Sequence, residues 1–292
     1  MPDLPAGSIT LCMIARDEED HLAWCLDSVR GVVDEIVVVD TGSQDRTAEL
    51  AADLGARVLF HDARDRATGD VDLAAARNHG LSHARGSFVL VLDADETLDP
   101  TSAASVRTLA RAGGDVGYVV ERRNHVPESL QVAWVDHAVR LFPNRPAHRY
   151  RHRIHETVDA SILAAGGRLA TSPVVVDHHL PAEPERRRKS ARRVELLLED
   201  LARNPDDAER LTFLAAEYHQ LGRFDEAAAT AERVCALAPD DSGARVVLAL
   251  YHWAFQANAG AARQDLAVAL SLRPGDPEVI ALLECLDESR LS

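Results

Sequence analysis

The segment from Ser87 to Glu96 limits what this chain can fold into more than any other part of the sequence. Its apolar run Phe88–Leu92 is rich in strand-forming residues and ends abruptly in two carboxylates, Asp93 and Asp95. A continuous apolar run is typical of a buried parallel strand, and open α/β sheets bind ligands at the carboxyl ends of such strands. Side chains two residues apart share one face of an extended chain, so Asp93 and Asp95 can converge on one hard cation.

An alternative interpretation is that these acids form a turn before a helix that starts near Pro100. Two further segments favour the ligand-binding interpretation. Asp34–Asp40 is a second apolar strand that ends in an aspartate, and Ser8–Ile14 is a third strand with an acidic segment after it. Helices are expected after both, over Thr47–Leu54 and through Leu22, Leu26 and Val29. We therefore expect an α/β fold with acids at one edge of a mostly parallel sheet.

Composition excludes several classes of partner and location. The chain has 292 residues with 32 Lys and Arg against 47 Asp and Glu, and this acidic balance argues against nucleic acid as a general partner. The N-terminus lacks the basic and apolar regions of a secretory signal, and the longest uncharged run, Val246–Ala262, is too polar for a membrane span. Without a Cys-x-x-Cys pair, the four cysteines are expected to be buried thiols in a reducing compartment, the cytoplasm: Cys12, Cys25, Cys235 and Cys285.

The composition changes near Pro181–Pro184, where strand-like runs give way to helical patterning. We place a domain boundary there, with an α/β domain over residues 1–182 and an all-helical domain over residues 183–292. Pro205, Pro239 and Pro274 in the second domain recur at intervals of 34 and 35 residues. This is the period of the tetratricopeptide (TPR) helix pair, so we expect a short TPR-like solenoid. Its role stays open between supporting the fold, self-association and binding of a protein partner or acceptor.

Four motifs in order give the first domain a specific resemblance. They are Ile9–Glu19, Val38–Ser43, Ala76–Asn78 and Asp93–Asp95. The chain resembles family 2 glycosyltransferases over residues 8 to about 180, and its tail resembles the subgroup with TPR repeats. The resemblance implies the GT-A fold, a mostly parallel sheet flanked by helices. It also implies metal-dependent, inverting transfer of a sugar from a nucleotide sugar, with UDP favoured as the carrier, to a glycan, peptide or lipid-linked acceptor.

The resemblance also implies roles for single residues. Asp40 would accept a hydrogen bond from the nucleobase, and Arg77 would reach the diphosphate with its guanidinium fork. Asp93 would approach the ribose and the metal, and Asp95 would ligate Mn²⁺ or Mg²⁺. The motifs place seven more residues at the donor site: Ala15, Asp17, Glu18, Gly42, Ser43, Asn78 and Ala94.

Inverting transfer also needs a carboxylate that takes the acceptor proton. His155–Glu156 resembles the His-Glu signature of the subgroup, so Glu156 is the expected base or acceptor-orienting acid, with His155 at the metal or the diphosphate. Asp136 is the rival base. His178 lies in a paired-histidine ending typical of the subgroup, but Leu180 replaces the usual glycine, which leaves a metal role for His178 open.

Two interpretations from other classes compete with a glycosyltransferase. In the first, a degenerate domain binds nucleotide weakly while the repeats recruit a partner, but scaffolding needs no set of polar groups on one sheet edge. In the second, the chain is a nucleotidyltransferase. That class would carry a basic, glycine-rich loop after the first strand, whereas this chain has the acidic segment Arg16–Glu19.

Overall fold

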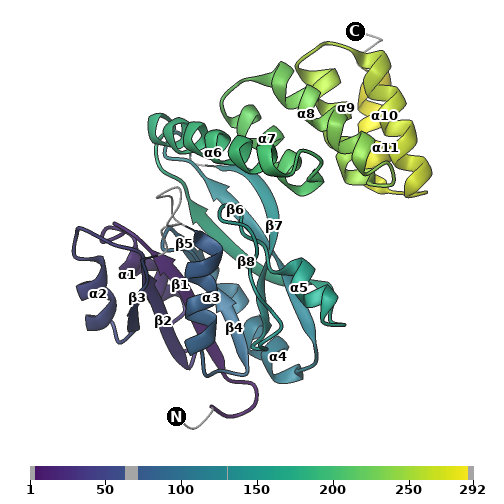
Figure 1. Ribbon diagram of the computed structural model, residues 1–292. Coiled ribbons are helices and arrows are strands. Elements are labelled where there is room, and N and C mark those ends of the chain that lie inside the picture. The colour runs from purple at the N-terminus through teal and green to yellow at the C-terminus, as the bar shows by residue number, and fades with distance from the viewer. Residues whose placement is uncertain (1–3, 63–71, 130, 289–292) are drawn as a thin grey trace. The chain divides into compact units, whose positions relative to one another are not determined.

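A computed structural model describes residues 4–62, 72–129 and 131–288 of the chain. The chain divides into two compact units, Met1–Ala182 and Glu183–Ser292. The first unit contains every strand and the second consists of helices (Figure 1). The structure therefore has the expected combination of an α/β part and a helical part.

The first unit is built on one eight-stranded sheet with the strand order β3-β2-β1-β4-β7-β6-β8-β5. Its first four strands are mutually parallel, with β1 between β2 and β4, so their carboxyl ends meet at one edge. The sequence predicted three of these strands and the parallel arrangement. The observed bounds are β1 Ile9–Ala15, β2 Glu35–Asp40, β3 Arg57–Phe60 and β4 Phe88–Val91.

The other half of the sheet is mixed. β7 runs antiparallel to both β4 and β6, while β6 and β8 are parallel. After β4 in the centre of the sheet, the next strand along the chain is β5 at the far edge. The Asp93–Glu96 segment therefore crosses the mixed half, past β7, β6 and β8. The sequence did not predict β5. The bounds are β5 Glu96–Leu98, β6 Val116–His125, β7 Val132–Pro143 and β8 Arg168–His179.

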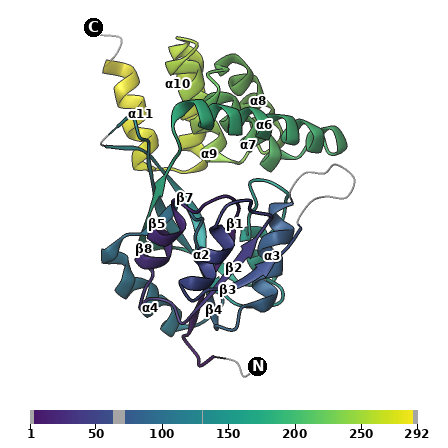
Figure 2. The same cartoon turned by 90° about the vertical axis from the view of Figure 1, so that its left-hand side faces the viewer.

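Helices cover both faces of the parallel half (Figure 2). Alternate side chains of a strand point to opposite faces, so Leu11 packs in the core that contains α1, while its neighbour Cys12 packs in the core that contains α3. This two-sided burial is the reason that β1, β2 and β4 are continuous apolar runs. The helices of the unit are α1 Leu22–Ser28, α2 Thr47–Asp53, α3 Leu73–His83, the 3₁₀ turn η1 Pro100–Ser102, α4 Ala103–Ala112 and α5 Asp159–Ala164.

The second unit is a TPR-like array of helices, and its sequence period has a local physical cause. Asp207 and Asp241 cap α7 and α9, each accepting a hydrogen bond from a backbone N–H three residues on. Asp276 accepts from the N–H groups of Glu278 and Val279 at the start of α11. Alternate helices thus begin with the same device. The bounds are α6 Glu183–Arg203, α7 Ala208–Gln220, α8 Phe224–Leu237, α9 Ser242–Ala254, α10 Ala259–Leu272 and α11 Pro277–Glu288.

The structure corrects one expectation about the cysteines. Cys12, Cys25 and Cys235 are buried free thiols as expected, and burial raises the pKa of Cys12 to about 12. Cys285 is exposed, because it lies on α11 outside the core cluster to which Val279 and Leu286 of the same helix belong. In the described part of the chain, no helix combines the length and the apolar composition that crossing a membrane requires.

Candidate active site

Three aspartates lie at the carboxyl edge of the parallel strands. Asp40 is the last residue of β2, and Asp93 and Asp95 follow β4. β1 is the single strand between β2 and β4, and neighbouring strands lie about 4.8 Å apart. The sheet topology therefore brings together the acids that the sequence singled out.

Asp40 uses one carboxylate oxygen within its own turn and leaves the other without a protein partner. Oδ1 accepts hydrogen bonds from the backbone N–H groups of Gly42 and Ser43, at 2.8 and 2.9 Å. Oδ2 is buried and has no hydrogen-bond partner among the described residues. Asp40 lies on the wall of a cavity of about 470 Å³, which is also lined by Arg16, Thr41, Gly42, Gln44, Phe60, His61 and Asp62.

The rim of this cavity is made of two loops that bind each other. Asp17, in the loop after β1, donates its backbone N–H to Ser43 Oγ at 3.1 Å and accepts from the backbone N–H of Gln44 at 2.7 Å. Glu18 donates its backbone N–H to Thr47 Oγ1 at 2.8 Å. Asp17 has a left-handed backbone with φ of 55°, an uncommon conformation that the bonds across the loops hold in place. Of the predicted donor-site residues in these loops, Gly42 lines the cavity, while Asp17, Glu18 and Ser43 join the loops beside it.

Arg77 lies on α3 and binds two acids from distant parts of the chain. Its Nη2 donates to Asp93 Oδ1 at 2.6 Å, and its Nε donates to Glu156 Oε1 at 2.5 Å. Burial alone would lower the pKa of Arg77, but the charges of Asp93 and Glu156 outweigh it and raise the pKa well above its ordinary value. Arg77 is therefore a permanent cation at the edge of the sheet.

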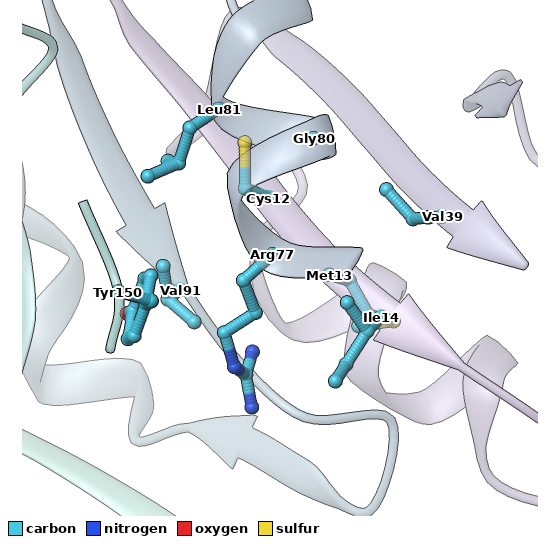
Figure 3. A pocket seen from close by; sticks show the side chains of 9 residues that line it. All are labelled: Cys12, Met13, Ile14, Val39, Arg77, Gly80, Leu81, Val91 and Tyr150. Atoms are coloured by element: carbon cyan, nitrogen blue, oxygen red, sulfur yellow. The ribbon is translucent and has the colours of Figure 1, made fainter. Parts of the chain in front are cut away.

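Tyr150 supports Arg77 from the side (Figure 3). The guanidinium carbon lies 5.5 Å from the centre of the Tyr150 ring, within the range of a cation–π contact. Arg77 Nη1 and the Tyr150 hydroxyl both lack a hydrogen-bond partner among the described residues, and both residues line a small cavity of about 10 Å³. That volume is close to the smallest that holds one water molecule.

Asn78 has a different place from the one the sequence suggested. Its Nδ2 donates to the carbonyl of Tyr150 at 2.9 Å, and its Oδ1 accepts from the N–H of Tyr150 at 2.8 Å. The amide group is thus engaged at both ends by the Tyr150 backbone. In this structure Asn78 holds the segment that carries Tyr150 next to Arg77.

Beyond Arg77, the charged side chains continue as what we call the ion-pair network. Arg140 on β7 donates from Nη2 to Asp93 Oδ2 at 3.0 Å and to Glu96 Oε1 at 2.6 Å. Arg122 on β6 donates to Glu96 at 3.2 Å and binds Asp136 with two hydrogen bonds of 2.7 and 2.9 Å. The network consists of Glu156, Arg77, Asp93, Arg140, Glu96, Arg122 and Asp136.

The network fixes the charge of its central acid. Burial would raise the pKa of Asp93, but the charges of Arg77 and Arg140 and the hydrogen bond from Arg77 hold it well below its usual range. Asp93 is therefore ionised, and its two oxygens are each bound by an arginine.

Asp95 lies next to a histidine with the orientation of a metal ligand. Asn124 donates from Nδ2 to Asp136 Oδ2 at 3.0 Å, which turns its amide oxygen toward His178 Nδ1 at 2.8 Å. An amide oxygen only accepts, so Nδ1 is the nitrogen that donates to Asn124, and Nε2 is the ring atom left to face a metal. That Nε2 lies 3.5 Å from Asp95 Oδ2. Two ligand atoms bound to one cation at about 2.1 Å lie roughly 3 to 3.5 Å apart, so the pair fits a divalent metal.

The predicted metal set of Asp93, Asp95 and His155 does not form such an arrangement. Over residues 4–62, 72–129 and 131–288, no three His, Cys, Asp or Glu side chains are placed to hold a metal ion. Both oxygens of Asp93 are bound by arginines, and His155 has a left-handed backbone with φ of 48° beside Glu156. The structure instead brings His178 to Asp95, a role that the sequence left open.

The two candidate bases differ in how their oxygens are used. Asp136 has both oxygens bound by Arg122, and Oδ2 also accepts from Asn124. Burial would raise the pKa of Asp136, but the hydrogen bonds and charge of Arg122 leave it below the usual value. Glu156 is bound by Arg77 through Oε1 alone.

Sequence reasoning missed the roles of Glu96, Arg122 and Tyr150. Glu96 follows Asp95 directly and begins a strand. A glutamate at such a position can be buried if a cation pairs with it, and this was the available signal. Its partners come from residues 26 and 44 positions further along the chain, and the sequence gives no register between such strands.

Comparisons with known proteins agree with this geometry. Residues 10–169 match the family model for glycosyl transferase family 2. This chain belongs to glycosyl transferase family 2. The match covers more than half of the chain and confirms the predicted GT-A-type α/β unit. It does not identify the donor, the acceptor or a metal.

Relatives of this family 2 chain include a TPR repeat-containing protein of Synechococcus elongatus, 37% identical over 69% of this chain and 50% of the relative. A glucosyl-3-phosphoglycerate synthase of Mycolicibacterium paratuberculosis is 33% identical over 30% of this chain and 28% of its own. The chain thus spans half or less of the length of these curated relatives. The solved structure of S. aureus TarS 1–349 aligns over 92% of both chains, with 14% identity and a TM-score of 0.45.

Proposed function

We propose that this chain is a metal-dependent, inverting glycosyltransferase that uses a nucleotide sugar, with UDP as the carrier. The observation that carries the proposal is the buried Asp40 Oδ2, which has no partner among the described residues, on a side chain at the wall of a cavity of about 470 Å³. A buried carboxylate oxygen without a hydrogen bond costs about 1–3 kcal/mol or more, which a ligand N–H would offset. The imide N–H of uracil is such a donor.

Asp95 and His178 are the residues that would hold the metal. A carboxylate with an imidazole suits Mn²⁺ better than Mg²⁺, which prefers oxygen ligands alone. The bound cation would act as a Lewis acid that stabilises the departing diphosphate. Arg77 would contribute a second positive charge, because its guanidinium lies at the same sheet edge and keeps its charge at every physiological pH.

Glu156 is the residue we propose as the base. Its Oε2 has no hydrogen bond among the described residues, whereas both oxygens of Asp136 are bound. During transfer, the acceptor hydroxyl would form a bond to the anomeric carbon and lose its proton to Glu156. The bond between the anomeric carbon and the diphosphate oxygen would break, and the nucleoside diphosphate would leave with the electron pair.

The acceptor class follows less directly from the site. A glycan, a peptide or a lipid-linked sugar each offers a hydroxyl that Glu156 could deprotonate. The TPR-like unit would recruit the acceptor or a protein partner, because stacked helix pairs present extended surfaces. We propose the cytoplasm as the location, where nucleotide sugars are available and the three buried thiols stay reduced.

The experiment that tests this function is calorimetric titration of UDP in the presence of Mn²⁺, with GDP as the nucleotide control. The wild type should bind UDP only with the metal, and Asp95→Asn should weaken that binding by about 100-fold or more because it removes a charged metal ligand. Asp27→Asn is the matched control, since Asp27 is an exposed acid on α1 whose side chain pairs with the neighbouring Arg30.

Binding of neither nucleotide to a folded wild type would overturn the UDP-sugar and GDP-sugar proposals together. The scaffold interpretation would then account better for the chain. Binding of UDP that is equal with and without Mn²⁺ would overturn the metal dependence alone.

A further inference from the structure

Glu96 is a completely buried acid next to the two aspartates of the site, and the proposed reaction gives it no chemical role. It is the first residue of β5, a strand of three residues at the edge of the sheet. A fully buried carboxylate is expensive unless several donors surround it. The donors that surround Glu96 therefore indicate what it does.

One carboxylate oxygen of Glu96 closes the turn that carries the aspartates. Oε2 accepts a hydrogen bond from the backbone N–H of Asp93 at 3.0 Å. In the reverse direction, the backbone N–H of Glu96 donates to the carbonyl of Asp93 at 3.0 Å. The Asp93–Glu96 segment is thus closed by two hydrogen bonds, which restricts the backbone of both Asp93 and Asp95.

The other carboxylate oxygen connects this turn to two strands of the mixed half. Oε1 accepts from Arg140 at 2.6 Å and from Arg122 at 3.2 Å. Arg140 also binds Asp93, and Arg122 also binds Asp136. Among these hydrogen bonds of the two arginines, Glu96 is the acid that both share, so it links the Asp93 turn to Arg122 as well as to Arg140.

We propose that Glu96 is a positioning residue that fixes the Asp93–Asp95 turn in the geometry that binds the metal and the diphosphate. The proposal rests on the proposed function. Glu96 acts through the turn and the two arginines, and it does not touch the ligand. Residues that orient metal ligands from behind change metal affinity or activity by about 10- to 100-fold when they are replaced.

Glu35 provides a matched control within the same unit. It is also buried, also begins a strand, and also accepts from a backbone N–H and an arginine, since Arg85 donates to it from the backbone at 2.8 Å and from Nε at 2.6 Å. It lies at the amino end of β2, opposite the edge that carries the site. Glu35→Gln thus removes a similar buried charge without touching the Asp93–Glu96 turn.

The experiment compares Glu96→Gln with Glu35→Gln by two measurements, calorimetric titration of UDP with Mn²⁺ and amide hydrogen exchange of the peptide that contains residues 93–96. Glu96→Gln should weaken Mn²⁺-dependent UDP binding by about 10- to 100-fold and speed exchange in that peptide. Glu35→Gln should leave both unchanged. If Glu96→Gln does not fold, the double variant Glu96→Gln with Arg122→Gln removes one acid and one base and keeps the net charge of the network.

Binding by the Glu96 variant within about threefold of the wild type would overturn the proposal, and so would an equal loss in Glu35→Gln. A wild type that binds no UDP with Mn²⁺ would instead overturn the proposed function, and with it the positioning of a donor site. In that case, faster amide exchange at residues 93–96 in Glu96→Gln would still establish that Glu96 holds the turn. Unchanged exchange would overturn the role of Glu96 in the turn as well.

Discussion

Asp40 and Asp93 lie at the same edge of the sheet, at the end of β2 and after β4, but their carboxylates differ in their hydrogen-bond partners. Asp40 lines a cavity, and its buried Oδ2 has no hydrogen-bond partner in the part of the chain that the structure describes. Asp93 has both oxygens bound by arginines, which belong to the ion-pair network. Among the described residues, the Asp40 carboxylate therefore keeps one unused acceptor atom, whereas both oxygens of the Asp93 carboxylate are in use.

The difference indicates two ways of preparing a site before the ligand arrives. On the Asp40 side, binding energy for the proposed donor would come from an acceptor that has no partner among the described residues. On the Asp93 side, the fold supplies fixed charges whose positions are set by one another, so little reorganisation is needed when a charged ligand binds. Substitutions on the Asp93 side should thus change stability first, and those on the Asp40 side should change binding first.

The largest expected effect is on the Asp93 side, from Arg140→Met. This change leaves Glu96 and Asp93 with one guanidinium fewer in a buried setting, and breaking such a pair from one side costs about 3–5 kcal/mol. The free energy of unfolding from urea titration should fall by that amount.

Arg107→Met is the control for this loss. Arg107 pairs with Asp34 in a partly exposed position at 2.7 Å, where removal should cost about 1 kcal/mol or less. Equal losses in the two variants would show that burial of the network adds nothing to the stability of the unit.

A smaller effect is expected on the Asp40 side, from Asp40→Asn. The amide oxygen of asparagine can still accept from Gly42 and Ser43, but its NH₂ group replaces the free oxygen and would face the nucleobase N–H as a second donor. UDP binding should weaken by about 10- to 100-fold, corresponding to about 1–3 kcal/mol, while urea stability changes little. A large loss of stability with unchanged UDP affinity would reverse the comparison between the two sides.

The smallest effect is a contribution to the pH dependence of stability from the Asp40 side, where His61 of the cavity wall stacks on His79, with ring centres 4.7 Å apart. Burial, and then the charges of His61 and His83, lower the pKa of His79 from its ordinary value of 6.5. The unfolded chain then binds more protons than the folded chain as the pH falls through that value, so stability is lost toward acidic pH. The arginines and Asp93 keep their charges over this range.

Urea midpoints at about pH 7.5 and about pH 5.5 measure this dependence. His79→Gln should make the two midpoints more similar, whereas the same change at the exposed His137 on β7 should leave the difference as in the wild type. If the pH dependence is unchanged in His79→Gln, groups other than His79 cause it.

The sequence predicted the parallel half of the fold because its signals are local. Apolar runs such as Phe88–Leu92 specify buried strands, and Asp207 and Asp241 specify helix starts 34 residues apart. The mixed half depends on pairing between distant strands. The register of β6 against β7 and β8 decides that Arg122, Asp136 and His178 meet near Asp95, and no local pattern carries that register.

The positions of several candidate site residues also follow from local signals. Asp40, Arg77, Asp93 and Asp95 follow from motif positions next to strand ends or on the helix beside them, and the structure brings them to one edge. The remaining partners depend on three-dimensional packing. Asn78 was expected at the donor, but its amide holds the Tyr150 backbone 72 residues away, a pairing that appears only in the folded unit.

The two loops around the Asp40 cavity are joined by hydrogen bonds in both directions, from Asp17 to Ser43, from Gln44 to Asp17 and from Glu18 to Thr47. Neither loop can change its course alone without breaking bonds of the other. Attempts to redirect nucleotide preference by exchanging one loop with that of a relative should therefore fail, and the two segments should be inherited and transplanted as a pair.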